Sequence, residues 1–214
     1  MLIAARDGRI HVIQQLLAGD TVDDINQGNG AGETPLWTAA LLGHLPCVNA
    51  LLADGRAEVN LADHDGWTPL YVAACEGHLT CLETILADGR ADINARNIDG
   101  WTSLLGACSR GQPEAVDMLI TAGADPWLRP HTGHHFNRTP LDVAVAKGDN
   151  GCVFVLENFL YRRPWTLGPA GSLQHMPRWV KDRAVTAVLC LQYHGLPPEI
   201  TDHILPFCTV AQRP

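Results

Sequence analysis

Residues 66–97 read GWTPLYVAACEGHLTCLETILADGRADINARN, and this stretch decides the fold of the chain. Thr68 is a residue type that caps helix N-termini, and Pro69 follows at the first helical position, where a missing N–H costs nothing. Gly77 is expected to end this helix in a left-handed conformation. A second helix is predicted after it, with an apolar face of Leu79, Leu82, Ile85 and Leu86. One such unit cannot bury its apolar face alone, so it must stack on neighbours.

The same pattern recurs along the chain in register. The slot after the helix-capping threonine is filled four times, at spacings of 34, 34 and 37 residues. The residues in this slot are Pro35, Pro69, Ser103 and Pro140. The glycines that close the first helix agree with it: Gly43, Gly77, Gly111 and Gly148. Such self-similarity predicts a repeat architecture, in which each unit packs mainly on its neighbours.

The segment Thr68–Ala74, followed by Gly77-His78, resembles the ankyrin repeat, whose signature is Thr-Pro-Leu-His-x-Ala in a unit of about 33 residues. The resemblance implies an all-α ankyrin-repeat solenoid with short β-turn and hairpin loops and a C-terminal helical segment. We expect an ankyrin-repeat domain over residues 1–161. The first repeat lacks the Thr-Pro-Leu-His portion, either because it caps the stack or because the chain starts inside a repeat. The repeats are placed at residues 2–31, 32–65, 66–99, 100–136 and 137–161.

Charge is distributed unevenly along the chain. Residues 1–160 carry nine Lys and Arg against twenty Asp and Glu, a net charge of −11, whereas residues 161–214 carry a net charge of +3. An acidic stack argues against a nucleic-acid partner and favours a protein partner with a basic patch. No apolar run is long enough to predict a membrane-spanning helix, and the N-terminus lacks the basic leader of a secretory signal.

The seven cysteines are interpreted as small apolar residues of the core rather than as a disulfide framework. Cys47 and Cys81 share one slot in successive repeats, and Cys75 and Cys108 lie next to the small residues of the first helices. Reduced cysteines predict a reducing compartment. We therefore expect a cytoplasmic protein, with the nucleus as the alternative location.

The sequence contains no nucleophile elbow, no phosphate-binding loop and no His-Glu-x-x-His zinc motif. We therefore expect a non-catalytic protein without cofactors. Three extra residues separate the fourth and fifth repeats, within Pro130–Phe136. The alternative is a metal-binding or enzymatic site at His131, His134 and His135. Closed zinc sites usually have four Cys or His ligands in recognisable pairs, which these histidines lack, so we favour a solvent-exposed loop.

The resemblance implies a protein-binding scaffold, whose partners usually meet the hairpin tips and the exposed side of the first helices. Trp67 and Trp101 stand out, because tryptophan is enriched among interface hot spots; the alternative is that each packs on the adjacent hairpin. Glu33 and Arg138 fill the same slot in other repeats, so the face runs from acidic through aromatic to basic. The candidate binding residues are Glu33, Asp63, His64, Asp65, Trp67, Glu76, Asn97, Ile98, Asp99, Trp101, Arg110 and Arg138.

Other aromatic and histidine residues of the repeats are interpreted as structural. Trp37 and Tyr71 occupy the slot that holds histidine in the ankyrin signature. His44 and His78 follow the glycine that closes the first helix, and the resemblance implies a structural role for both.

The repeat pattern stops before the C-terminus. Residues 162–177 are predicted to be a Pro- and Gly-rich linker, and residues 178–214 to hold helices over Arg178–Tyr193 and Leu196–Leu205. This arrangement resembles the suppressor-of-cytokine-signalling box proteins, which recruit elongin and cullin and act as substrate-recognition adaptors of ubiquitin ligases. The last segment also resembles the opening of an F-box, but too few residues follow it. Pro177 stands where the box family has a cysteine, and we favour the alternative of a helical cap on the last repeat.

Overall fold

The structure is a computed structural model that describes residues 1–19, 24–133 and 136–162, and the predicted C-terminal segment lies outside these residues. The described residues form ten helices and no strand, which confirms the predicted all-α solenoid. None of these helices is long and apolar enough to cross a membrane. They pair into successive units: α1 (Leu2–Arg6) with α2 (Ile10–Ala18), α3 (Pro35–Leu41) with α4 (Leu45–Asp54), α5 (Pro69–Glu76) with α6 (Leu79–Ala87), α7 (Ser103–Arg110) with α8 (Pro113–Thr121), and α9 (Pro140–Lys147) with α10 (Asn150–Arg162).

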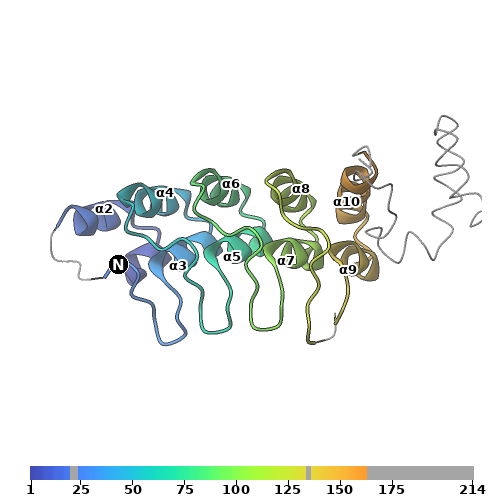
Figure 1. Cartoon of the computed structure of the whole chain (residues 1–214). Coiled ribbons are helices and arrows are strands. Elements are labelled where there is room, and N and C mark those ends of the chain that lie inside the picture. The colour runs from blue at the N-terminus through green and yellow to red at the C-terminus, as the bar shows by residue number, and fades with distance from the viewer. Residues whose placement is uncertain (20–23, 134–135, 163–214) are drawn as a thin grey trace, which may run out of the picture. The chain divides into compact units, whose positions relative to one another are not determined.

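The helices are arranged in two layers (Figure 1). The first helix of each unit lies in one layer, where α3 packs on α1 and α5, and α7 packs on α5 and α9. The second helices form the other layer. The loops that lead into α3, α5, α7 and α9 project in a row from the first-helix layer, away from the second helices. These loops are the hairpins that the sequence predicts.

Each complete first helix begins with the same cap. The hydroxyl oxygen of a threonine accepts a hydrogen bond from the backbone N–H three residues further on, which satisfies a donor that the helix itself leaves unpaired. Ser103 replaces proline after this threonine in α7, and the helix still begins in register. Gly77 has φ +72° and ends α5, as predicted. The capping residues are Thr34, Thr68, Thr102 and Thr139.

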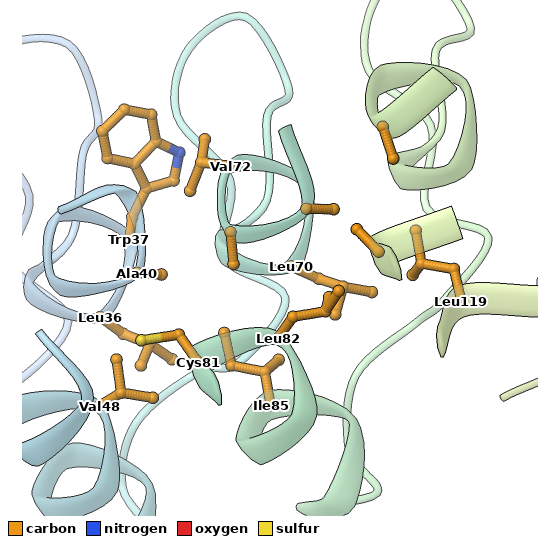
Figure 2. Packing of buried hydrophobic residues seen from close by; sticks show 14 of the residues in the cluster. Leu36, Trp37, Ala40, Val48, Leu70, Val72, Cys81, Leu82, Ile85 and Leu119 are labelled. Atoms are coloured by element: carbon orange, nitrogen blue, oxygen red, sulfur yellow. The ribbon is translucent and has the colours of Figure 1, made fainter. Parts of the chain in front are cut away.

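Buried apolar side chains form one cluster that runs through the stack. Figure 2 shows Val72 of α5 beside the indole of Trp37 in α3, and Cys81 of α6 on the side of Val48 in α4. All the cysteines of the described residues are buried and reduced, which agrees with their interpretation as small core residues. They are Cys47, Cys75, Cys81, Cys108 and Cys152.

Histidine side chains join neighbouring units. The Nε2 atom of His44 lies 3.1 Å from the carbonyl oxygen of Arg6, and that of His78 lies 2.9 Å from the carbonyl oxygen of Leu41. Each ring therefore donates to the last turn of the preceding first helix, where carbonyl groups lack a helical partner. Gly43 leaves room for this contact, because a Cβ there would lie 2.6 Å from Nδ1 of His78.

Arg90 makes a second connection between units, which the sequence analysis did not predict. Its guanidinium forms hydrogen bonds of 2.7 and 2.9 Å with the carboxylate of Asp88. It also donates to the carbonyl oxygens of Leu52, Gly55 and Ala57, at 3.2, 3.1 and 3.1 Å. Arg90 thereby closes the C-terminal end of α4 in the preceding unit.

The last described unit exposes apolar side chains where its predecessors do not. Val145 is 60% exposed, although Ala40, Ala74 and Cys108 in the same slot are fully buried. Phe154 in α10 is 67% exposed, so it does not belong to the buried side of that helix. Val145 therefore marks the end face of the stacked units.

Candidate functional site

The tips of the hairpins that lead into α5 and α7 are each built around one short polar side chain. The Oδ1 atom of Asp63 accepts hydrogen bonds from the backbone N–H groups of Asp65, at 3.1 Å, and Trp67, at 2.8 Å. In the next hairpin, the Oδ1 atom of Asn97 accepts hydrogen bonds from the backbone N–H groups of Asp99, at 3.0 Å, and Trp101, at 2.8 Å. Asp and Asn favour such turns because their side chains can accept from the backbone just after them.

Neighbouring hairpins are also tied to one another. The backbone N–H of His64 donates to the carbonyl oxygen of Ala31 in the preceding hairpin, at 2.9 Å. In the same way, the backbone N–H of Ile98 donates to the carbonyl oxygen of Asp65, at 3.2 Å. Gly66 has φ +86°, and a Cβ there would lie 2.8 Å from the Cα of Asn97. Because the backbones bond and approach so closely, the side chains at the tips are held in a fixed row.

Three aromatic residues lie where the hairpins enter their helices. The Nε1–H of Trp37 donates to the carbonyl oxygen of Trp67 at 2.9 Å, and Trp37 is only 6% exposed. The rings of Trp67 and Tyr71 stack with their centroids 4.0 Å apart and their planes tilted by 30°. Trp67 and Trp101 each pack partly against the core and are partly exposed. Trp37 is therefore structural, whereas Trp67 and Trp101 combine packing with an accessible surface.

Next to Trp67, the packed side chains of Tyr71 and Cys75 stay neutral. Burial raises the pKa of the Tyr71 hydroxyl above its ordinary value, and burial raises the pKa of the Cys75 thiol to about 11. A thiol with a raised pKa is a poor nucleophile, so this pair fits packing rather than chemistry. Gly106 of the next unit faces both side chains, and its lack of a Cβ makes room for them.

The structure separates the candidate binding residues by exposure. Asn97 is only 6% exposed, and its Nδ2 atom has no hydrogen-bond partner among the described residues. Because Asn97 shapes the turn from inside, we leave it out of the candidate surface and call the remaining candidates the hairpin–helix face. Its exposed members are His64, Asp65, Glu76, Ile98, Arg110 and Arg138. Its partly buried members are Glu33, Asp63, Trp67, Asp99 and Trp101.

The loop between α8 and α9 adds one residue that the sequence analysis did not single out. Phe136 is 64% exposed. Its position as an apolar residue within the insertion is the feature of the sequence that could have pointed to it. In the same loop the ring of His131 lies 3.1 Å from the carbonyl oxygen of Ile98. His134 and His135 lie outside the described residues, within which no three His, Cys, Asp or Glu side chains gather as around a metal ion. The metal-site alternative stays a sequence hypothesis.

Comparison with protein families gives two matches. Residues 1–97 match a family described as ankyrin repeats in three copies, and residues 99–129 match one described as ankyrin repeat. Together the matches cover more than half of the chain and include the helices α1 to α8. No curated protein matches the chain. Residues 130–214 lie outside both matches, so the resemblance to a suppressor-of-cytokine-signalling box or an F-box is not shown.

Proposed function

The chain belongs to the ankyrin-repeat family, whose repeats are protein–protein interaction modules, and we propose that it binds a partner protein through the hairpin–helix face. The proposed role is that of a scaffold, since ankyrin repeats are typically non-catalytic. The family match supports a protein as the partner. The geometry of the hairpins supports the face, because their tips are tied into one row.

The partly exposed tryptophans are the observation that carries this proposal. Trp67 and Trp101 present aromatic surface from hairpins whose backbones are fixed by hydrogen bonds. A large side chain that packing already holds loses little conformational entropy on binding, so it is suited to be a hot spot. Ile98, which is 64% exposed at the tip of the hairpin that carries Trp101, extends the apolar surface.

Mutation of the tryptophans tests the proposal once a partner is in hand. A pull-down with the full chain, read by mass spectrometry, identifies the partner. Trp67→Ala and Trp101→Ala are then expected to weaken binding by about 2 kcal/mol or more, which is roughly 30-fold in Kd. Trp127→Ala is the matched control, because Trp127 is also partly buried but lies outside the hairpin–helix face. If both variants lose that much folding stability and bind normally once folded, the two indoles belong to the core and the proposed face is wrong.

The C-terminal segment, outside the described residues, carries two competing proposals that one deletion separates. If it is a cap, deleting residues 172–214 lowers the melting temperature of the repeats, because repeat stacks depend on their end caps. If it is a recruitment box of a cullin-type ubiquitin ligase adaptor, the repeats melt as before and elongin and cullin disappear from the pull-down. We favour the cap, because Pro177 stands where the box family has a cysteine.

A further inference from the structure

The hairpin–helix face changes its sign of charge from one end to the other. In the opposite layer, α4, α6 and α8 contain only acidic charged residues, whereas α10 of the fifth unit contains both Glu157 and Arg162, so a row with several cationic residues at its end is found on the hairpin–helix face. The carboxylates lie toward its start: Glu33, Asp63, Asp65, Glu76 and Asp99. The cationic members of the face, Arg110 and Arg138, lie toward its end. Next to them, α9 adds Lys147 in its last turn and one carboxylate, Asp142, in its first turn, which accepts hydrogen bonds from the N–H and the hydroxyl of Thr139.

Apolar surface lies where the sign changes. Trp67 lies in the hairpin that leads into α5, and Ile98 and Trp101 lie in the hairpin that leads into α7. The same hairpin contains Asp99, and Arg110 is the last residue of α7. Ile98 is 64% exposed, and the two indoles are partly exposed. The face therefore presents an acidic end, an apolar middle and a basic end in the order of the repeats.

The length of this pattern matches a short extended chain. Packed helices lie about 8–10 Å apart, so the three steps from the unit of Glu33 to the unit of Arg138 span roughly 30 Å. An extended chain advances about 3.3 Å per residue, so about nine residues cover the face.

We propose that the partner presents to this face an extended segment with three parts in order. Lys or Arg at one end lies over the second and third units, a large apolar residue lies over Trp67, Ile98 and Trp101, and Asp or Glu at the other end lies over the fifth unit. Charge complementarity supports this order of residues, because it steers association and sets the register of the bound segment. The inference rests on the proposed function and adds the chemistry and direction of the partner.

Selection of peptides tests the order directly. The full chain, immobilised, is used to select from a displayed library of random peptides about twelve residues long, which is enough to cover the face. Enriched peptides are expected to separate Lys or Arg from Asp or Glu by an apolar residue, with one order of charges along the peptide predominating. Raising the salt concentration should weaken their binding, because the charges involved are near the surface.

Charge reversal locates the two ends. Asp65→Lys with Glu76→Lys is expected to weaken binding of the enriched peptides about tenfold and to remove the selection for Lys and Arg, because repulsion between like charges replaces attraction between exposed opposite charges. Arg110→Glu with Arg138→Glu is likewise expected to weaken binding about tenfold and to remove the selection for Asp and Glu. All four side chains are exposed, so the changes should leave the core intact.

The matched control for the Asp65→Lys and Glu76→Lys variant makes the same change of net charge on the opposite layer. Glu83→Lys with Asp117→Lys should leave both the affinity and the selected pattern unchanged, since both residues are exposed on second helices. The inference is overturned, while the proposed function stands, if the enriched peptides depend on Trp67 but show no order of charge. The same holds if the peptides keep their affinity for both charge-reversed variants. A captured partner protein without any enriched peptide also overturns it. Failure to capture either a protein or a peptide overturns the proposed function.

Discussion

Replacing Gly106 by alanine tests the packing beneath the hairpin–helix face. Gly106 lies inside α7, and a Cβ at this position would lie 2.5 Å from the Sγ of Cys75 and 2.7 Å from the Cε2 of Tyr71. Folded proteins do not keep a Cβ atom that close to another heavy atom, so one of the two side chains must move. Because Tyr71 stacks on Trp67 at 4.0 Å, the movement reaches the aromatic surface.

Whether Gly106→Ala raises or lowers the free energy of unfolding tests this packing. In a helix interior without steric conflict, alanine is more favourable than glycine by about 1 kcal/mol. Overpacking a filled core costs about 1–3 kcal/mol. Cys75 is buried and Tyr71 is mostly buried, so neither can turn into solvent without losing core contacts. We expect Gly106→Ala to lower the free energy of unfolding by about 1 kcal/mol, the overlap outweighing the gain in helix propensity.

Urea unfolding of the full chain, followed by far-ultraviolet circular dichroism, measures this change. The matched background combines Tyr71→Leu with Cys75→Ala, which removes both overlapping groups; Leu105 shows that leucine fits the Tyr71 slot in the next unit. In that background Gly106→Ala should become neutral or stabilising by up to about 1 kcal/mol. The packing of Gly106 against Tyr71 and Cys75 would be refuted if Gly106→Ala stabilised the unmodified chain. It would also be refuted if Gly106→Ala lowered the free energy of unfolding equally in both backgrounds.

Two further predictions concern the hairpin and the contact between units. Asn97→Asp should lower the free energy of unfolding in urea at neutral pH by about 1 kcal/mol, because it keeps the acceptor Oδ1 but puts an unpaired carboxylate oxygen where the buried Nδ2 lies, whereas Asp63 is only partly buried in its turn; a gain of stability would contradict this burial. Arg90→Ala should lower the melting temperature more than Arg110→Ala, because only Arg90 bonds to the carbonyls that end α4. The hydrogen bond from Arg90 holds the pKa of Asp88 below its ordinary value, so the stabilisation by this pair is present above about pH 4 and is lost as the pH falls through the lower folded-state pKa. The difference in melting temperature between the unmodified chain and Arg90→Ala should therefore narrow in acid, and a difference that does not depend on pH would contradict the pairing.

The first helices could be predicted closely because their determinants are local. Thr68 caps α5 through its own hydroxyl, and Pro69 occupies the first helical position. Gly77 ends the helix, which is less than three turns long. Each of these residues acts on backbone groups within a few positions in the sequence. Their recurrence in register then implied the stack, because a single pair of helices cannot bury its apolar face.

The candidate surface could be predicted only in part, because contacts between units decide it. The turn position of Asn97 is visible in the sequence, but its burial depends on how closely the hairpins pack. Gly106 is an unfavourable helix residue by propensity alone, and its purpose emerges only with Tyr71 of the preceding unit beside it. Arg90 has the sequence appearance of a solvated charge, and its carbonyl partners belong to the preceding unit.

Hydrogen–deuterium exchange of the full chain, with and without the captured partner, tests the central claim most directly. Binding at the hairpin–helix face predicts slower exchange in residues 63–68 and 97–102 and in the helices α5 and α7, with α4, α6 and α8 unchanged. Protection confined to α4, α6 and α8, or to residues 163–214, would contradict the claim that the partner binds at the hairpins and first helices.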